Sequence, residues 1–123
     1  MKTLWLDWKT YPVKIGFSPD KKSFEKIMKE IGSENSSYPK QIASTTTFTN
    51  ENNNCYILVT LNELLDEENP IEVMLSIIHE SVHVWQRVKE NIGQSGICGD
   101  EIDAYSIEFI SKFLIVSYKK TRM

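Results

Sequence analysis

The feature that most constrains the fold is a long apolar run, residues 71–88, which carries both histidines of the chain. The run is longer than an ordinary strand, so it is predicted to form a largely buried helix. Inside it, His79 and His83 lie four positions apart, in the sequence His-Glu-Ser-Val-His. Residues four apart lie one above the other on a helix, so both imidazoles can reach one ion. Glu80 leaves the helix about 100° around from His79 and is placed to face a water on that ion.

Two histidines and a neighbouring glutamate favour zinc as this ion. A catalytic zinc site combines three protein ligands, drawn from nitrogen, oxygen and sulfur donors, with a water molecule. An accidental match, or one exposed and one core histidine, is the plainer alternative. Two neutral histidines and a carboxylate on a covered helix would be costly without a partner, which weighs against it. His79 and His83 are therefore predicted zinc ligands, and a third ligand must come from elsewhere.

The chain as a whole limits the other possibilities. Its 123 residues suit one domain with a real core, so residues 1–123 are predicted to be a single domain. The formal net charge of −3 gives no electrostatic footprint for a nucleic-acid partner. No segment reaches the length of a membrane span, and the apolar start is broken at Asp7, too early for a signal peptide. Neither a nucleic-acid partner nor a membrane partner is expected.

The first part of the chain predicts a strand followed by a helix. Trp5 and Trp8 are expected to pack an arm onto the core. Residues 11–17 alternate between apolar and other side chains, as a half-buried strand does. Ser18 is expected to cap an amphipathic helix over residues 19–31, which has a proline at its first position and a glycine after its end.

The remainder predicts a hairpin and two long helices. Strands over residues 41–49 and 55–61 pair across an Asn-rich turn, and the first of them has a mostly polar second face. Asn69 can cap the central helix, residues 70–90, and a last helix follows over residues 100–118. The fold class is thus α+β, with a small mixed or antiparallel three-stranded sheet. The predicted core face of the central helix consists of Met74, Ile78, Val82, Trp85 and Val88.

The last helix offers candidates for the third ligand. Glu101, Tyr105 and Glu108 recur at helical spacing, and Ala104 leaves room for close approach to the central helix. Glu101 follows His83 by enough residues for a helix end, a loop and a return. The preferred ligand is Glu101, and the alternatives are Glu108, Asp100 and Cys98.

Other polar residues near this helix have simpler interpretations. Asp100 and Asp103 are expected to be solvated acids at its N-terminus. Cys55 and Cys98 are neither adjacent nor arranged as Cys-x-x-Cys. In the absence of an export signal they are interpreted as reduced thiols, which predicts a cytoplasmic location. A loop thiol is the preferred interpretation of Cys98.

These two helices together resemble the gluzincin class of zinc peptidases. In that class an H-E-x-x-H helix is followed by a second helix with a glutamate ligand in an E-x-x-A motif, which here reads Glu101-Ile102-Asp103-Ala104. The surrounding sequences, His-Glu-Ser-Val-His-Val-Trp-Gln and Gly-Asp-Glu-Ile-Asp-Ala-Tyr, are similar to small metallopeptidases of bacteria and their phages. The resemblance covers residues 70–110.

The resemblance implies a zincin-like fold of the minigluzincin type, with zinc held by His79, His83 and Glu101. It implies that Glu80 is the catalytic base and that a protein or peptide substrate lies along an edge strand, for which residues 41–49 are the candidate. Larger gluzincins carry a further histidine or tyrosine that stabilises the oxyanion. Here only Tyr105 or Tyr56 could take that role, and core packing is the simpler role for either.

Two classes of function follow. The first is a zinc metallopeptidase, a hydrolase that acts on peptide bonds. The second is a zinc-stabilised module that binds protein without cutting it. The presence of Glu80 favours the enzyme, because a structural zinc site closed by protein ligands needs no general base.

Overall fold

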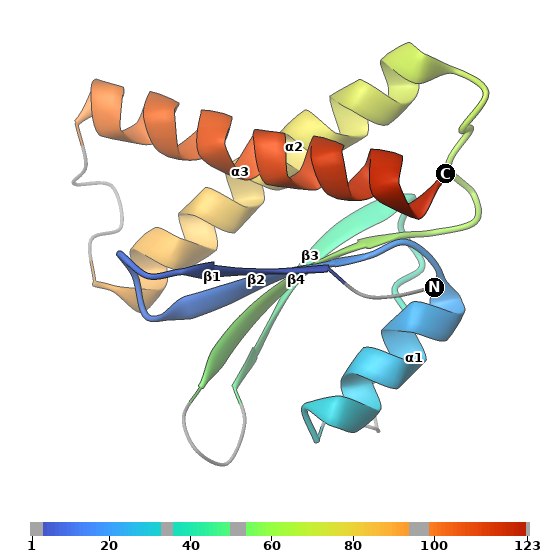
Figure 1. Ribbon diagram of the computed structural model, residues 1–123, viewed down its shortest axis with the longest axis horizontal. Helices are drawn as coiled ribbons and strands as arrows, with labels where there is room; N and C mark the ends of the chain where they lie inside the picture. Colours follow the sequence, from blue (N-terminus) through green and yellow to red (C-terminus); the bar gives the residue numbers. More distant parts are fainter. Residues whose placement is uncertain (1–3, 33–35, 50–53, 94–98, 123) are drawn as a thin grey trace.

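The computed structural model describes residues 4–32, 36–49, 54–93 and 99–122, which form three helices and four strands (Figure 1). The predicted α+β class is confirmed. In chain order the elements are β1 (Leu4–Trp8), β2 (Val13–Ser18), α1 (Lys21–Glu30), β3 (Ala43–Thr49), β4 (Cys55–Leu61), α2 (Pro70–Asn91) and α3 (Asp100–Thr121).

The four strands form one mixed sheet in the order β1-β2-β4-β3. β1 pairs antiparallel with β2, and β3 pairs antiparallel with β4, which confirms the predicted hairpin. β2 and β4 are parallel, and the chain between them passes through α1, because parallel neighbours need a crossover connection. β3 is therefore an edge strand, as predicted for residues 41–49, and β1 is the other edge.

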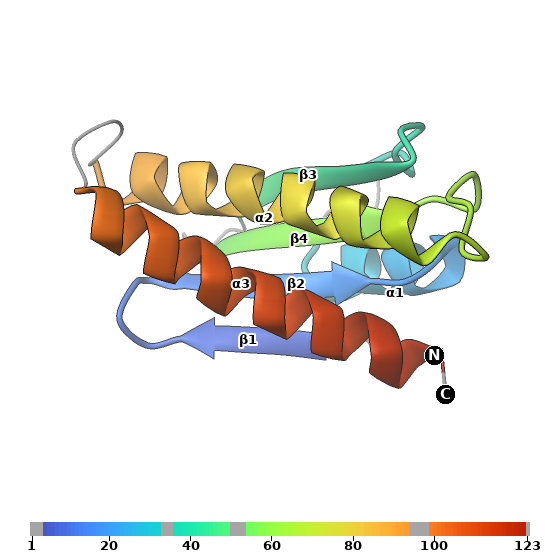
Figure 2. The ribbon, with the colours of Figure 1, turned by 90° about the horizontal axis from the view of Figure 1, so that it is seen from above.

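The helices cover both faces of this sheet. α1 packs on one face, and α2 and α3 pack side by side on the other (Figure 1). Seen from above, α2 lies alongside β3, while α3 crosses over the half of the sheet that contains β1 and β2 (Figure 2). One long side of α2 thus faces α3, and its other side faces the edge strand β3.

The prediction of three strands was wrong, because the segment expected to pack onto the core as an arm forms a fourth strand over residues 4–8. Trp5 stands opposite Gly16 in the register of β1 and β2. A Cβ atom at Gly16 would lie 2.6 Å from Cζ3 of the Trp5 ring. The indole therefore occupies the space that the glycine leaves open and supplies the packing that a glycine lacks. A short segment with mixed charges at a chain end gave no such signal in the sequence.

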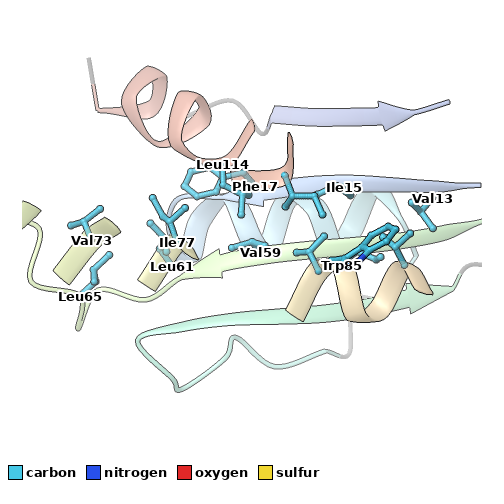
Figure 3. Packing of buried hydrophobic residues seen from close by; sticks show 14 residues of the cluster. Val13, Ile15, Phe17, Val59, Leu61, Leu65, Val73, Ile77, Trp85 and Leu114 are labelled. Atoms are coloured by element: carbon cyan, nitrogen blue, oxygen red, sulfur yellow. The ribbon is translucent and has the colours of Figure 1, made fainter. Parts of the chain in front are cut away.

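The core face of α2 also differs from the prediction. Its buried apolar residues are Val73, Ile77, Val84, Trp85 and Val88, and they pack on Ile15, Phe17, Val59 and Leu61 of the sheet (Figure 3). Of the predicted face, Trp85 and Val88 are buried, whereas Ile78 is 48% exposed. The run is apolar on nearly every side, so its periodicity does not select one face. None of the described helices is both long and apolar enough to cross a membrane.

The helix starts were predicted with mixed success. Asn69 caps α2 as predicted, because its side chain accepts a hydrogen bond from the backbone N–H of Glu72, and a proline follows at the first position. The cap of α1 is Asp20 and not Ser18, since Asp20 accepts from the N–H of Ser23 at 2.8 Å. Aspartate and serine are comparable caps, so sequence alone could not choose between them.

Replacing Gly16 with alanine tests the packing of β1. The added methyl group must displace the Trp5 ring, so the free energy of unfolding should fall by about 1–3 kcal/mol. Urea unfolding of Gly16→Ala would measure this loss. In a Trp5→Ala background the same substitution should cost far less, and equal costs in the two backgrounds would contradict the assignment.

Candidate metal centre and its groove

His79 and His83 lie on consecutive turns of α2, on the side of the helix away from the buried core face. Their Nε2 atoms approach to 3.1 Å, and the two rings meet edge to face with centroids 4.7 Å apart. The His79 side chain is 67% exposed. The two imidazoles therefore point their ring nitrogens at one accessible spot, as the spacing predicted.

The ring of His83 is held by Gln86, which lies almost one turn further along α2. Nδ1 of His83 lies 3.0 Å from Oε1 of Gln86. An amide oxygen can only accept a hydrogen bond. Nδ1 of His83 therefore carries the ring hydrogen and donates the hydrogen bond to Oε1 of Gln86. In the neutral ring the lone pair is then on Nε2, the atom that faces His79. A hydrogen bond of this kind to the outer nitrogen is what orients a metal-binding histidine.

The distance between the two histidines suits zinc. Zn–N bonds of about 2.0–2.1 Å at tetrahedral angles place two ring nitrogens about 3.3 Å apart. The observed 3.1 Å needs only a small adjustment. Among the described residues, however, no group of three or more His, Cys, Asp or Glu side chains is placed to hold a metal ion. The structure thus brings two predicted ligands together and does not bring a third to them.

Glu80 is a buried carboxylate at the side of this pair. The residue is 5% exposed, and its Oε1 accepts a hydrogen bond of 2.8 Å from the hydroxyl of Thr45 on β3. Its Oε2 lies 4.0 Å from Nε2 of His79, a separation that a water molecule can bridge. One oxygen is thus fixed by the edge strand, and the other lies near His79.

A groove between α2 and β3 contains these residues. One hollow of about 480 Å³ is lined by Thr45 to Thr47 of β3 and by His79, Glu80, His83 and Arg87 of α2. A second hollow of about 340 Å³ adjoins it at His79 and Glu80 and is lined by Ile42, Leu75 and Ser76. His79 and Glu80 therefore lie where the two hollows meet, and His83 lines the first of them.

The predicted residues on α3 lie apart from this arrangement. Glu101 is exposed in the first turn of α3, and Glu108 is exposed two turns later. Tyr105 is 67% exposed. Their predicted roles as ligand or oxyanion partner stay predictions. Cys98 lies outside the described residues.

Tyr56 and Cys55 are placed away from the histidines. Tyr56 contacts Trp5 at a ring distance of 5.6 Å and lines a hollow with Glu30 and Ile31 of α1, on the opposite face of the sheet from α2. It is therefore not positioned to stabilise an oxyanion at the histidine pair. Cys55 is a free thiol at the start of β4, where burial raises its pKa.

The prediction that Asp103 is a solvated acid was wrong. Its Oδ1 accepts a hydrogen bond of 2.7 Å from the indole nitrogen of Trp85 and lies 3.4 Å from Nζ of Lys89. The hydrogen bond from Trp85, with the nearby charge of Lys89, lowers the pKa of Asp103. Asp103 therefore joins α3 to α2, while Asp100 is exposed as predicted. A buried indole N–H needs an acceptor, which was the signal available in the sequence.

The sequence reasoning also missed Thr45 and Arg87. Thr45 belongs to a run of three threonines, so nothing in the sequence singles out its hydroxyl. Arg87 follows His83 by four positions and lines the same hollow. Helical spacing from the histidines could have identified it.

Comparison with protein-family models, with curated proteins and with solved structures finds no match to this chain.

Replacement of Thr45 by valine tests the support of Glu80. The substitution keeps the shape and strand propensity of the side chain but leaves a buried carboxylate oxygen without its partner. We expect the free energy of unfolding to fall by about 1.5–3 kcal/mol, the range for hydrogen bonds to charged groups. Urea unfolding measures it. Thr47→Val, at an exposed position of the same strand, is the matched control and should change stability little. Similar values for the two variants would contradict the role of Thr45.

Proposed function

We propose that the protein is a zinc-dependent peptidase of zincin-like fold that hydrolyses peptide bonds in a protein or peptide substrate. The observation that carries the proposal is the placement of Glu80. A buried carboxylate, fixed at one oxygen by Thr45, has its other oxygen 4.0 Å from Nε2 of His79, which lies 3.1 Å from Nε2 of His83. Two convergent imidazoles and an adjacent base are part of what hydrolysis by a zinc-activated water requires, and they support the proposal.

In the proposed mechanism each residue has a separate task. His79 and His83, with Glu101 as third ligand, would hold the zinc ion. When bound, zinc supplies a Lewis acid that lowers the pKa of a water to about 7 and polarises the scissile carbonyl. Oε2 of Glu80 accepts the proton of the attacking water and passes it to the leaving amine. Thr45 holds the other oxygen of Glu80, and Gln86 holds His83 in the tautomer that leaves Nε2 free.

The substrate is proposed to lie in the groove between α2 and β3. β3 is an edge strand, so one row of its backbone N–H and C=O groups is free to pair with an extended peptide. The hollows that flank His79 and Glu80 provide space for side chains on both sides of the cleaved bond. A cytoplasmic location is part of the proposal, because Cys55 is a free thiol.

A zinc-stabilised binding module is the second candidate. It is favoured by the absence, among the described residues, of a third side chain grouped with the histidines. The exposed position of Tyr105 also leaves the oxyanion without a placed partner. The same groove would then hold a peptide without cutting it. A peptidase needs the carboxylate of Glu80 as a base for hydrolysis, whereas a binding module does not.

Substitution of Glu80 by glutamine separates these two functions. Glutamine keeps the size of the side chain and a hydrogen bond with Thr45 but removes the base. For a peptidase, zinc content and fold should be retained, while hydrolysis of a peptide library falls at least about a hundredfold. His79→Ala is the comparison variant and should lose zinc as well as activity. Equal hydrolysis by wild type and Glu80→Gln would contradict the proposed mechanism.

The third ligand can be identified by paired substitutions on α3. Glu101→Ala should reduce the zinc content of the purified protein, because a carboxylate ligand is lost. Glu108→Ala, two turns away and equally exposed, should retain it. Metal analysis after dialysis measures both variants. The reverse pattern would assign the ligand to Glu108, and retention of zinc by both variants would exclude these two residues.

A further inference from the structure

The two ends of the groove differ in chemistry. On the side of Leu75, which precedes the histidines on α2, the hollow is apolar and is lined by Ile42 and Leu75. On the side that follows the histidines, it is lined by Thr45, Thr46 and Thr47 of β3 and by Arg87. Apart from Gln41, the lining residues advance in the same order along α2 and along the segment of Ile42 to Thr47, so the two hollows are opposite ends of one groove. Of the described residues that line either hollow, Arg87 is the only lysine or arginine.

Arg87 is positioned for contact with a ligand. It lies four residues after His83 and therefore occupies the next turn of the same face of α2. Its side chain is 39% exposed, and Nη1 forms an ion pair of 3.1 Å with Glu90, whose side chain is 49% exposed. Exposed pairs of this kind contribute little, so the pair can yield to a better partner. A guanidinium carries five N–H donors in a plane that matches a carboxylate.

The charged side chains around Arg87 indicate which kind of ligand it can bind. The charged or titratable side chains beside it are His79, His83 and Glu80 in the hollow and Glu90 on the exposed side. Glu80 is buried and accepts its hydrogen bond from Thr45, whereas the ion pair of Arg87 is with Glu90. The chain as a whole carries a net charge of −3, so a cation in this groove is not part of a general basic surface.

We infer that Arg87 is a specificity-determining residue that binds a carboxylate of the substrate. The substrate class is a peptide with an acidic group on one side of the cleaved bond and an apolar residue on the other, the latter at Ile42 and Leu75. The carboxylate belongs either to an acidic side chain or to the C-terminus of the peptide. This inference rests on the proposed peptidase function for its position relative to the cleaved bond, but the binding it describes does not need cleavage.

The inference is tested by measuring how tightly peptides bind to the zinc-loaded Glu80→Gln protein. This variant should hold peptides without cutting them. The probes are fluorescein-labelled peptide libraries with glutamate, glutamine or lysine fixed at one scanned position, each made with a free or an amidated C-terminus. Anisotropy should show about tenfold tighter binding of glutamate than of glutamine libraries at one or two adjacent positions. Amidated libraries that keep the preference identify a side-chain carboxylate, and a preference confined to free C-termini identifies the terminal one.

Second-site variants in the same background decide whether Arg87 is responsible. Arg87→Gln should abolish the acidic preference, and Arg87→Glu should shift it to lysine. Glu90→Gln, which removes the competing carboxylate, should strengthen the acidic preference. Lys112→Gln removes an exposed positive charge from α3, outside both hollows, and should leave the preference unchanged.

Hydrolysis by proteins with an intact Glu80 separates this inference from the proposed function. If Arg87→Gln raises KM for acidic peptides alone, the inference holds. If it lowers kcat equally for acidic and neutral peptides, Arg87 acts on the reacting centre and the inference is overturned. Acid-selective, Arg87-dependent binding without hydrolysis by any variant would support the inference and refute the peptidase. The absence of any acidic preference in binding would overturn the inference even if hydrolysis occurs.

Discussion

The carboxylate of Glu80 is the constraint on which the arrangement of α2 and β3 depends. A buried carboxylate is stable only with partners, and the hydroxyl of Thr45 at 2.8 Å is the partner that β3 supplies. The edge strand must therefore lie close enough to α2 for one short side chain to reach across. An apolar residue of similar volume at position 80 would make the fold at least as stable as Glu80 does. A carboxylate that is fixed at one oxygen and faces a hollow is consistent with the proposed role of Glu80 as a base.

The position of α3 relative to α2 is fixed at both ends of α3 by contacts that do not involve the histidines. Near its start, Asp103 receives the indole N–H of Trp85 and pairs with Lys89. At its end, Arg122 and the hydroxyl of Tyr118 both donate to Glu67 in the segment before α2, and the bond from Arg122 is the main cause of the lowered pKa of Glu67. A ligand from α3 would thus come from a helix that is already docked. Bound metal would then add stability by mass action and would not be required for folding, unlike the zinc of a zinc finger.

Residues with a strong local signal were placed correctly from the sequence. The cap at Asn69 and the four-residue spacing of His79 and His83 need only the geometry of one helix, and both have the expected arrangement. Features that depend on distant partners were missed or mistaken. Ile78 was expected in the core because α2 is apolar on most sides, and only the docking of sheet and α3 selects the buried face. Asp103 looked like a solvated acid because its partners, Trp85 and Lys89, are 18 and 14 residues away in the sequence.

The order of the strands explains why the groove forms between α2 and β3. Because β4 pairs with β2 and β3 pairs with β4, the hairpin places β3 at one edge of the sheet, and β1 forms the opposite edge. α3 covers the side of α2 that faces β1 and β2, so the side with His79, His83 and Arg87 remains beside β3 (Figure 2). The threonine-rich sequence of β3 fits this place, since threonine is strand-forming and its hydroxyl can line a wet groove. The threonine-rich composition of β3 and the placement of the histidines therefore both suit the same strand order.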